Sequence, residues 1–302
     1  MSFSSNAKRE LCALPLPEAD RKALAYGMLL FARSFSLQGI SLTTENRAVS
    51  QLLADLITGC GCIADVTSTL SRKKGEGGAV TVTVPDGNDR LRLLERFGYT
   101  GQEVNLRIHY QNFLEDSCAA AFLRGVFLSC GAVTDPSKDY HMEFSVPYMK
   151  LSQDLAAFLA RLDGLQMEPG TTNRKGTFVV YLKGSEQITD LLTFIGAQQA
   201  SMELMQVKMV KEVRNYVNRT TNFETANISK TASAAALQLE AIRKIQRTQG
   251  LESLPEELQE LALLRLENPE MSLRELGESL SEPISRSGVN HRLRRLLALA
   301  GE

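Results

Sequence analysis

The sequence predicts a chain of class α+β, in which two tandem α/β repeats with pseudo-twofold symmetry precede an all-α domain that ends in a helix-turn-helix. Three observations carry this prediction. First, two stretches show the same succession of an apolar helix, strands and a closing helix. Second, three short amphipathic segments with capping residues follow one another over residues 254–300. Third, a polar stretch separates these two patterns. At 302 residues the chain is long enough for two domains with separate cores.

The repeats span about 20–100 and 118–198. Each opens with an apolar helix that carries one glycine, Gly27 in the first copy and Gly125 in the second. Because glycine has no side chain, we expect these two helices to approach each other closely along the pseudo-axis. The expected strands and closing helices are 80–84 with 88–97, and 178–182 with 186–195.

The domain boundaries follow from composition. Residues 1–218 are expected to form the front domain, which ends in a methionine-bearing amphipathic helix. Residues 219–228 are polar and are expected to form a hinge. A new helix beginning at Ser229 would open the helical domain, 229–302, with the helix-turn-helix at about 254–300.

Three capped helices make up the predicted helix-turn-helix. Ser253 and Ser272 are each followed three residues later by glutamate, which is the capping-box pattern. Asn268-Pro269 ends the first helix, since the residue before a proline avoids the α region. The third helix starts near Ser285, and its apolar residues recur at helical spacing.

The third helix carries side chains of the types that bond base edges and phosphates. In a helix-turn-helix, this recognition helix enters the major groove of double-stranded DNA. The predicted DNA-binding residues are Ser285, Arg286, Ser287, Gly288, Asn290, His291, Arg292, Arg294 and Arg295. The alternative is a small three-helix cap with a solvated charged face.

Charge is distributed unevenly along the chain, although the net charge is −1. Residues 251–282 hold two Arg against nine Glu, a net charge of −7, whereas residues 285–302 hold four Arg against one Glu, a net charge of +3. Basic stretches elsewhere could add phosphate contacts; in the front domain they could equally be solvated hairpin loops. The auxiliary candidates are Arg72, Lys73, Lys74, Arg174, Lys175, Arg243, Lys244 and Arg247.

These blocks together resemble the WhiA family of bacterial sporulation and cell-division regulators, and the front repeats resemble the LAGLIDADG homing-endonuclease fold. The matching motifs are Phe122–Leu128, Asn218-Arg219, Asn222, Glu224–Asn227, Lys230-Thr231 and Ser285–Leu293. One departure is the run Thr220–Phe223, where relatives usually carry a second Asn before a Cys. The expected fold is therefore a LAGLIDADG-like tandem followed by the helix-turn-helix domain.

The resemblance implies a transcription regulator that binds DNA mainly through its C-terminal module, with roles in sporulation or in cell division and chromosome segregation. The alternative is a nucleoid-associated division factor that bridges DNA or protein without controlling transcription. A second, regulatory protein is a candidate partner in either case.

An enzyme is not expected. LAGLIDADG nucleases hold divalent metal with one acidic residue five positions after each helix glycine, and here those positions are Ala32 and Cys130, which are not hard oxygen ligands. Five cysteines and the close pair Cys60-Gly61-Cys62 indicate small buried thiols rather than a zinc site or a disulfide framework. No metal or cofactor is therefore predicted.

The sequence contains no apolar run long enough to span a bilayer and no apolar leader at its start. We therefore expect a cytoplasmic, nucleoid-associated protein with no membrane partner. Because the two repeats already form a pseudo-dimer within one chain, we expect a monomer.

Overall fold

The structure is a computed structural model that describes residues 2–69, 78–113 and 116–301. The chain forms two compact units, Met1–Glu212 and Val213–Glu302, which we call the front unit and the helical unit. Each unit has its own apolar core, and no buried residue belongs to both. Across the described ranges, no helix combines the length and apolar character that a membrane span needs.

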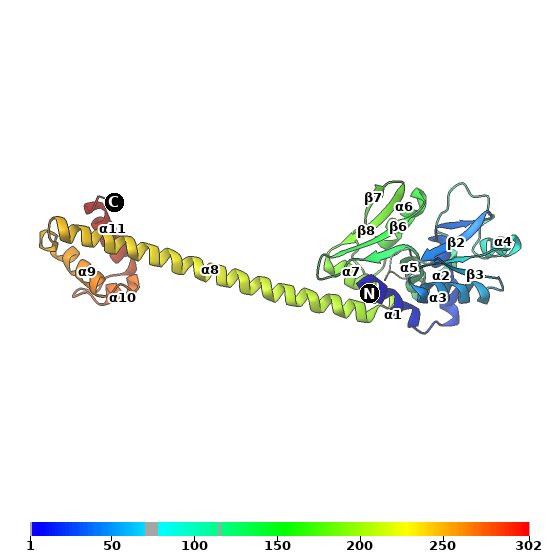
Figure 1. Cartoon of the computed structure of the whole chain (residues 1–302), viewed down its shortest axis with the longest axis horizontal. Helices are drawn as coiled ribbons and strands as arrows, with labels where there is room; N and C mark the ends of the chain where they lie inside the picture. The colour runs from blue at the N-terminus through cyan, green and yellow to red at the C-terminus, as the bar shows by residue number, and fades with distance from the viewer. Residues whose placement is uncertain (1, 70–77, 114–115, 302) are drawn as a thin grey trace. The chain divides into compact units, whose positions relative to one another are not determined.

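The front unit contains the predicted repeat (Figure 1). After α1 (Phe3–Ala13), each copy runs helix, two strands, helix, two strands, helix. The first copy is α2 (Glu18–Leu30), β1 (Ser34–Ser36), β2 (Gly39–Thr44), α3 (Arg47–Gly59), β3 (Asp65–Thr69), β4 (Ala79–Thr83) and α4 (Gly87–Arg96). A short 3-10 turn at Tyr110–Asn112 precedes the second copy. The second copy is α5 (Asp116–Cys130), β5 (Gly131–Val133), β6 (His141–Val146), α6 (Met149–Leu159), β7 (Gly170–Arg174), β8 (Thr177–Lys183) and α7 (Ser185–Ile195).

The two sheets have equivalent topology. Their strand orders are β1-β2-β4-β3 and β5-β6-β8-β7, and all neighbouring strands are antiparallel. Leu42 pairs with Val82 in one sheet, as Phe144 pairs with Val180 in the other, and all four side chains are buried. Alternate residues of these strands therefore face the core, as the period of two in a half-buried sheet requires.

Helices α2 and α5 pack against each other through their glycines, as the sequence predicts. A Cβ atom at Gly27 would lie 2.2 Å from the carbonyl oxygen of Phe122, and a Cβ atom at Gly125 would lie 2.4 Å from that of Leu24. Such distances are well inside van der Waals contact, so the backbones meet at the two glycines. Helix α2 also contacts β1 and β2, and α5 contacts β5 and β6, so each of the two helices packs against the sheet of its own repeat.

The expected hinge at 219–228 is instead part of one helix. Helix α8 runs without interruption over Gln198–Thr248, so no new helix begins at Ser229. The physical reason is that residues 219–228 contain neither glycine nor proline, and polarity alone does not break the main-chain ladder. The Thr231 hydroxyl donates to the carbonyl of Asn227 at 2.9 Å, which is the i to i−4 bond of a polar residue inside a helix.

The helical unit packs the second half of α8 against α9 (Glu256–Glu267), α10 (Leu273–Glu278) and α11 (Arg286–Leu299), with a 3-10 turn at Leu251–Ser253. The predicted box at Ser272 forms in full, with side-chain bonds in both directions between Ser272 and Glu275. The predicted box at Ser253 does not form. Helix α9 starts only after Pro255, and the Ser253 hydroxyl donates instead to the carbonyl of Gly250 at 2.8 Å.

Candidate nucleic-acid interface

Helix α11 begins at the cap that the sequence predicts. The Ser285 side chain accepts a hydrogen bond from the backbone N–H of Gly288 at 3.3 Å, which satisfies one of the donors that a helix start leaves open. Val289, Leu293 and Leu296 are buried, and α11 contacts both α9 and α10. This packing fixes which face of α11 points outward.

The turn between α10 and α11 is closed by a glycine that the sequence analysis missed. The backbone N–H of Ile284 donates to the carbonyl of Gly277 at 3.0 Å. A Cβ atom at Gly277 would lie 2.4 Å from the carbonyl oxygen of Ile284 and 3.0 Å from the side chain of Val289. The signal available in the sequence was a glycine inside a short amphipathic helix, where it otherwise costs stability.

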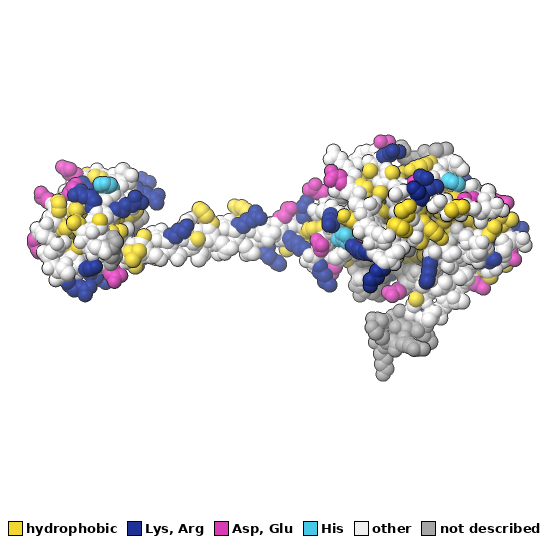
Figure 2. Space-filling model, turned by 90° about the horizontal axis from the view of Figure 1, so that it is seen from above, with side chains coloured by type: hydrophobic (Ala, Val, Ile, Leu, Met, Phe, Trp, Pro, Cys, Tyr) yellow, Lys and Arg dark blue, Asp and Glu magenta, His cyan; other side chains and the backbone are white. Residues whose placement is uncertain are grey.

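All nine predicted DNA-binding residues lie on α11 or at its cap. Six are exposed: Ser285, Arg286, Ser287, His291, Arg294 and Arg295. Gly288, Asn290 and Arg292 are half-buried. Figure 2 shows Lys and Arg side chains grouped on the surface of the helical unit, with acidic side chains beside them. The arrangement is a polar and basic face on an otherwise apolar helix.

Two of the arginines are held by one acidic side chain. Glu257, in the first turn of α9, pairs with Arg292 at 3.2 Å and with Arg295 at 2.8 Å. The Arg292 side chain is 17% exposed, whereas that of Arg295 is 46% exposed. Arg292 therefore serves mainly to attach α11 to α9, and Arg295 remains partly accessible. Among the described residues, Arg286 and Arg294 form no ion pair.

The two acidic residues of α10 bond to partners on or next to the same helix. The Glu275 carboxylate accepts from the backbone N–H of Ser272 at 2.7 Å, and this bond to the N-cap lowers the pKa of Glu275. Glu278 pairs with Arg274 at 2.8 Å, one turn away. Glu278 is thus neutralised by Arg274, whereas Glu275 stays ionised and is held at the N-cap of α10.

The auxiliary basic residues fall into three groups. Arg243, Lys244 and Arg247 are exposed on the last turns of α8, within the helical unit. Arg174 and Lys175 lie at the tip of the β7–β8 hairpin, where Lys175 and Gly176 both have positive φ, as a two-residue type I′ turn requires. Arg174 pairs there with Glu143 of β6 at 2.9 Å. Arg72, Lys73 and Lys74 lie outside the described residues.

The positions where a LAGLIDADG nuclease holds its metal have a different chemistry here. Ala32 is buried just after α2, and Cys130 is the last residue of α5. Burial raises the pKa of the Cys130 thiol to about 12, and the nearby Lys8 ammonium opposes this only in part. Lys8 Nζ donates to the carbonyl of Leu128 at 3.1 Å, so an amine and not a carboxylate lies beside the end of α5, and burial lowers the pKa of that amine. In the described part of the chain, no group of three acidic, His or Cys side chains is placed to hold a metal ion.

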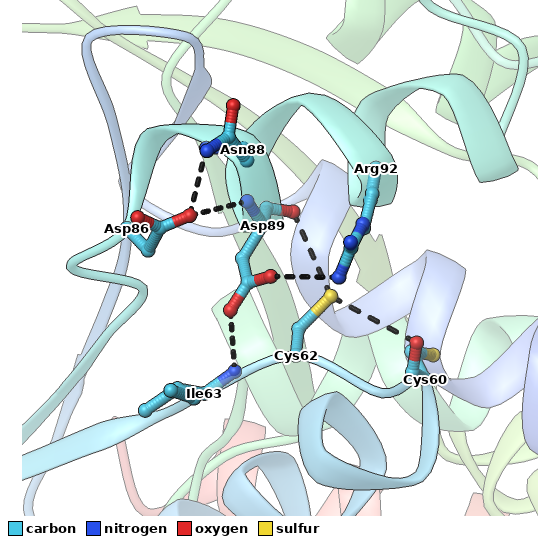
Figure 3. Close-up of polar contacts among 7 residues, drawn as sticks. All are labelled: Cys60, Cys62, Ile63, Asp86, Asn88, Asp89 and Arg92. Atoms are coloured by element: carbon cyan, nitrogen blue, oxygen red, sulfur yellow. Dashed lines mark hydrogen bonds and ion pairs between the residues drawn. The ribbon is translucent and has the colours of Figure 1, made fainter.

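The close cysteine pair belongs to a structural contact between α3, β3 and α4 (Figure 3). Cys62 is buried, and its thiol donates to the carbonyls of Cys60 and Asp89 at 3.8 Å and 3.7 Å. The Asp89 carboxylate accepts from the backbone N–H of Ile63 at 2.8 Å and pairs with Arg92 at 3.4 Å. Burial raises the pKa of both thiols, so they are protonated and inert at neutral pH.

The whole chain is similar to proteins of one family. The family described as "WhiA C-terminal HTH domain" matches residues 217–300, and that described as "WhiA LAGLIDADG-like domain" matches residues 119–214. A protein named "Probable cell division protein WhiA" from Clostridium tetani is 35% identical, over 100% of this chain and 98% of its own length. The chain belongs to the WhiA family.

Further relatives agree with this membership. A WhiA protein of the same name from Caldicellulosiruptor saccharolyticus is 38% identical, over 100% of this chain and 95% of its own length. The crystal structure of full-length DUF199/WhiA from Thermatoga maritima covers 100% of this chain and 98% of that one, with a TM-score of 0.60 and 26% identity. The resemblance and the fold class predicted from the sequence are both confirmed: a LAGLIDADG-like unit precedes a WhiA helix-turn-helix domain.

Proposed function

We propose that this WhiA-family chain is a sequence-specific DNA-binding transcription regulator that acts in cell division and chromosome segregation, and in sporulation where the host forms spores. The observation that carries the proposal is the outward face of α11, a capped helix whose apolar side is buried and whose exposed side is polar and basic. A helix presented in this way fits the major groove. The relatives' name supports the link to cell division.

The residue types suggest a division of roles along α11. Asn290, His291 and Arg294 have the chemistry to bond base edges, since Asn pairs with adenine and Arg with guanine. Ser285, Arg286 and Ser287 surround the helix start, where hydroxyls and a guanidinium suit phosphate oxygens. Gly288 has no side chain, and a Cβ atom there would lie 3.3 Å from the side chain of Ile284, so we assign it to the packing of the helix start. Arg295 adds a partly accessible charge, and Arg292 orients the helix through Glu257.

The front unit has a different part in this proposal. With Ala32 and Cys130 at the positions of the metal ligands and Lys8 near Cys130, it has the chemistry of a binding module and not of a metal-dependent nuclease. Its partner would be DNA, through the hairpin tip at Arg174 and Lys175, or a regulatory protein. We infer a monomer located at the nucleoid, because the pseudo-twofold tandem needs no second chain to complete it.

Genome-wide occupancy combined with transcript profiling tests this proposal. The full-length chain and an Asn290→Ala/Arg294→Ala variant would each be expressed in a host that lacks its own copy. Occupancy at discrete sites, with changed transcription of the adjacent genes and loss of both in the variant, is the expected result. Broad occupancy with unchanged transcripts would favour a nucleoid-bridging factor instead and would overturn the regulatory role.

A further inference from the structure

A second feature of the helical unit is a cavity of about 440 Å³ between α8, α9, α10 and the start of α11. Four of its lining residues are cationic and none is acidic: Lys230, Arg265, Arg274 and Arg286. Arg274 is already paired with Glu278 at 2.8 Å, so the charge of the cavity comes from the other three. We call this hollow the basic cavity. Its composition is unexpected because the segment 251–282, which supplies much of its wall, carries a net charge of −7 from two Arg and nine Glu.

Arg265 is the deepest of these cations. The residue is 2% exposed, yet its guanidinium bonds only to neutral acceptors: Nε donates to the Gln238 side chain at 3.2 Å and an Nη donates to the carbonyl of Met271 at 2.6 Å. Burial lowers the pKa of this guanidinium, and no described carboxylate forms an ion pair with it. A buried charge without a counter-charge is costly, so an anion in the cavity would stabilise it.

A guanidinium has five N–H donors, of which the bonds to Gln238 and Met271 use two. The others bond to no described residue, and Arg265 lines the cavity. Donors in a planar fork are suited to two oxygens of one phosphate or carboxylate. Arg265 therefore brings unused N–H donors to the wall of the basic cavity, and their chemistry suits the oxygens of a phosphate or carboxylate.

The rim of the cavity leads to α11. Lys230 is exposed on α8, and Arg286 is the first residue of α11. Arg286 also lines an adjoining hollow of about 470 Å³ together with Leu273, Ser287 and Asn290. Arg286, which we assign to the DNA interface, thus borders both hollows, so the basic cavity lies next to the N-terminal end of α11.

We propose that the basic cavity seats one phosphate group of the DNA backbone, held by Arg265 and Lys230, and so sets the register of α11 on its site. This inference rests on the proposed function, and it adds a contact made by α8 and α9 instead of the recognition helix. Neutralising a phosphate by a fixed cation strengthens binding and adds to its salt dependence.

The test uses the full chain and a duplex that it selects from a random library. Lys230→Gln removes an exposed rim charge without disturbing the core. Arg219→Gln is the matched control, because it removes one charge from the same helix about three turns away, on the same helix face and outside the cavity. Arg265→Lys keeps the buried charge but loses the planar N–H donors of the guanidinium. A thermal melt of each variant checks that it is folded.

Lys230→Gln is expected to weaken binding about tenfold and to reduce the slope of log affinity against log salt by about 0.9, while the control changes neither beyond about twofold. Arg265→Lys is expected to weaken binding with little change of slope. A duplex with one neutral methylphosphonate at the seated position should bind the wild-type chain about tenfold less tightly than the unmodified duplex. The loss should be smaller in Lys230→Gln, where only Arg265 still holds that phosphate.

Several results would overturn the inference. Equal behaviour of Lys230→Gln and Arg219→Gln would do so, as would the absence of any methylphosphonate position whose effect is smaller in Lys230→Gln than in the wild type. A small-anion site would be revealed if inorganic phosphate, at fixed ionic strength, stabilised the wild type but not Lys230→Gln without any coupling to DNA. If the wild type selects no duplex, the proposed function fails and this inference fails with it. If the Asn290→Ala/Arg294→Ala variant loses binding and Lys230→Gln does not, the proposed function stands and the phosphate site in the basic cavity does not.

Discussion

Replacing Gly125 by alanine tests whether the α2–α5 contact holds the front unit together. The added Cβ atom would lie 2.4 Å from the carbonyl oxygen of Leu24, 2.9 Å from the backbone nitrogen of Met28 and 3.1 Å from the Cα atom of Gly27. An ordinary contact for a Cβ atom begins at about 3.4 Å. The helices would have to separate by roughly 1 Å, since backbone atoms cannot rotate away as a side chain can.

The expected change in the free energy of unfolding follows from two opposing effects. Overpacking costs about 1–3 kcal/mol, and this rigid backbone clash belongs at the upper end of that range. Alanine gains about 1 kcal/mol over glycine in helix propensity. We therefore expect Gly125→Ala to destabilise the front unit by about 2 kcal/mol. The matched control is Gly59→Ala at the end of α3, where a Cβ atom would meet nothing within 4 Å and the change should be neutral or stabilising.

Tyrosine signals make the front unit visible on its own. Of the 7 tyrosines, only Tyr216 lies outside the front unit, it is 71% exposed, and the chain has no Trp. Near-UV circular dichroism during a urea titration therefore reports the tertiary packing of the front unit. A midpoint for Gly125→Ala at or above that of the wild type, with an unchanged slope, would refute the close-packing argument.

Three further outcomes are expected. Ser285→Ala should lower the stability of the helical unit by about 1 kcal/mol through loss of the α11 cap, whereas Ser287→Ala in the same turn should not; equal urea midpoints would contradict this. With a pKa near 12, the Cys130 thiol should resist iodoacetamide at pH 8 in the native chain and react after denaturation. Mass spectrometry of the peptide that contains Cys130 measures the labelling, and modification of the native chain would contradict this expectation. The pKa of Glu275 is lowered in the folded state, so this residue stabilises the helical unit above the unfolded pKa of about 4.3, and that stabilisation is lost as pH falls through the lower folded pKa. Glu275→Gln should remove this part of the acid dependence of stability. Thermal melts between pH 7 and pH 3 would measure it.

The sequence predicted those features that leave a signature in the residue types themselves. The glycines at 27 and 125 mark the close contact of α2 and α5 because no other residue type fits there. The cap at Ser285 and the capping box at Ser272 follow from neighbours three residues apart. The repeat was visible because both copies keep the same order of elements, and equal strand orders follow from it.

The remainder has two causes: local helix boundaries that differ from those the residue types indicate, and tertiary contacts that spacing cannot express. Polar residues at 219–228 remain helical because the flanking turns of α8 continue on both sides. The box expected at Ser253 is lost because Pro255 delays the start of α9. Glu257 lies 35 residues before Arg292, and only the packing of α9 on α11 brings them together. The same is true of Lys230 and Arg265, which the basic cavity places together.

The most direct test of the central claim is the affinity of the purified chain for its selected duplex and for a scrambled duplex, measured at several salt concentrations. The wild type should prefer the selected duplex by at least about a thousandfold, and Asn290→Ala/Arg294→Ala should lose most of this preference while keeping salt-dependent binding to the scrambled duplex. Unchanged preference in that variant, with its fold intact, would contradict the assignment of α11 as the helix that reads DNA.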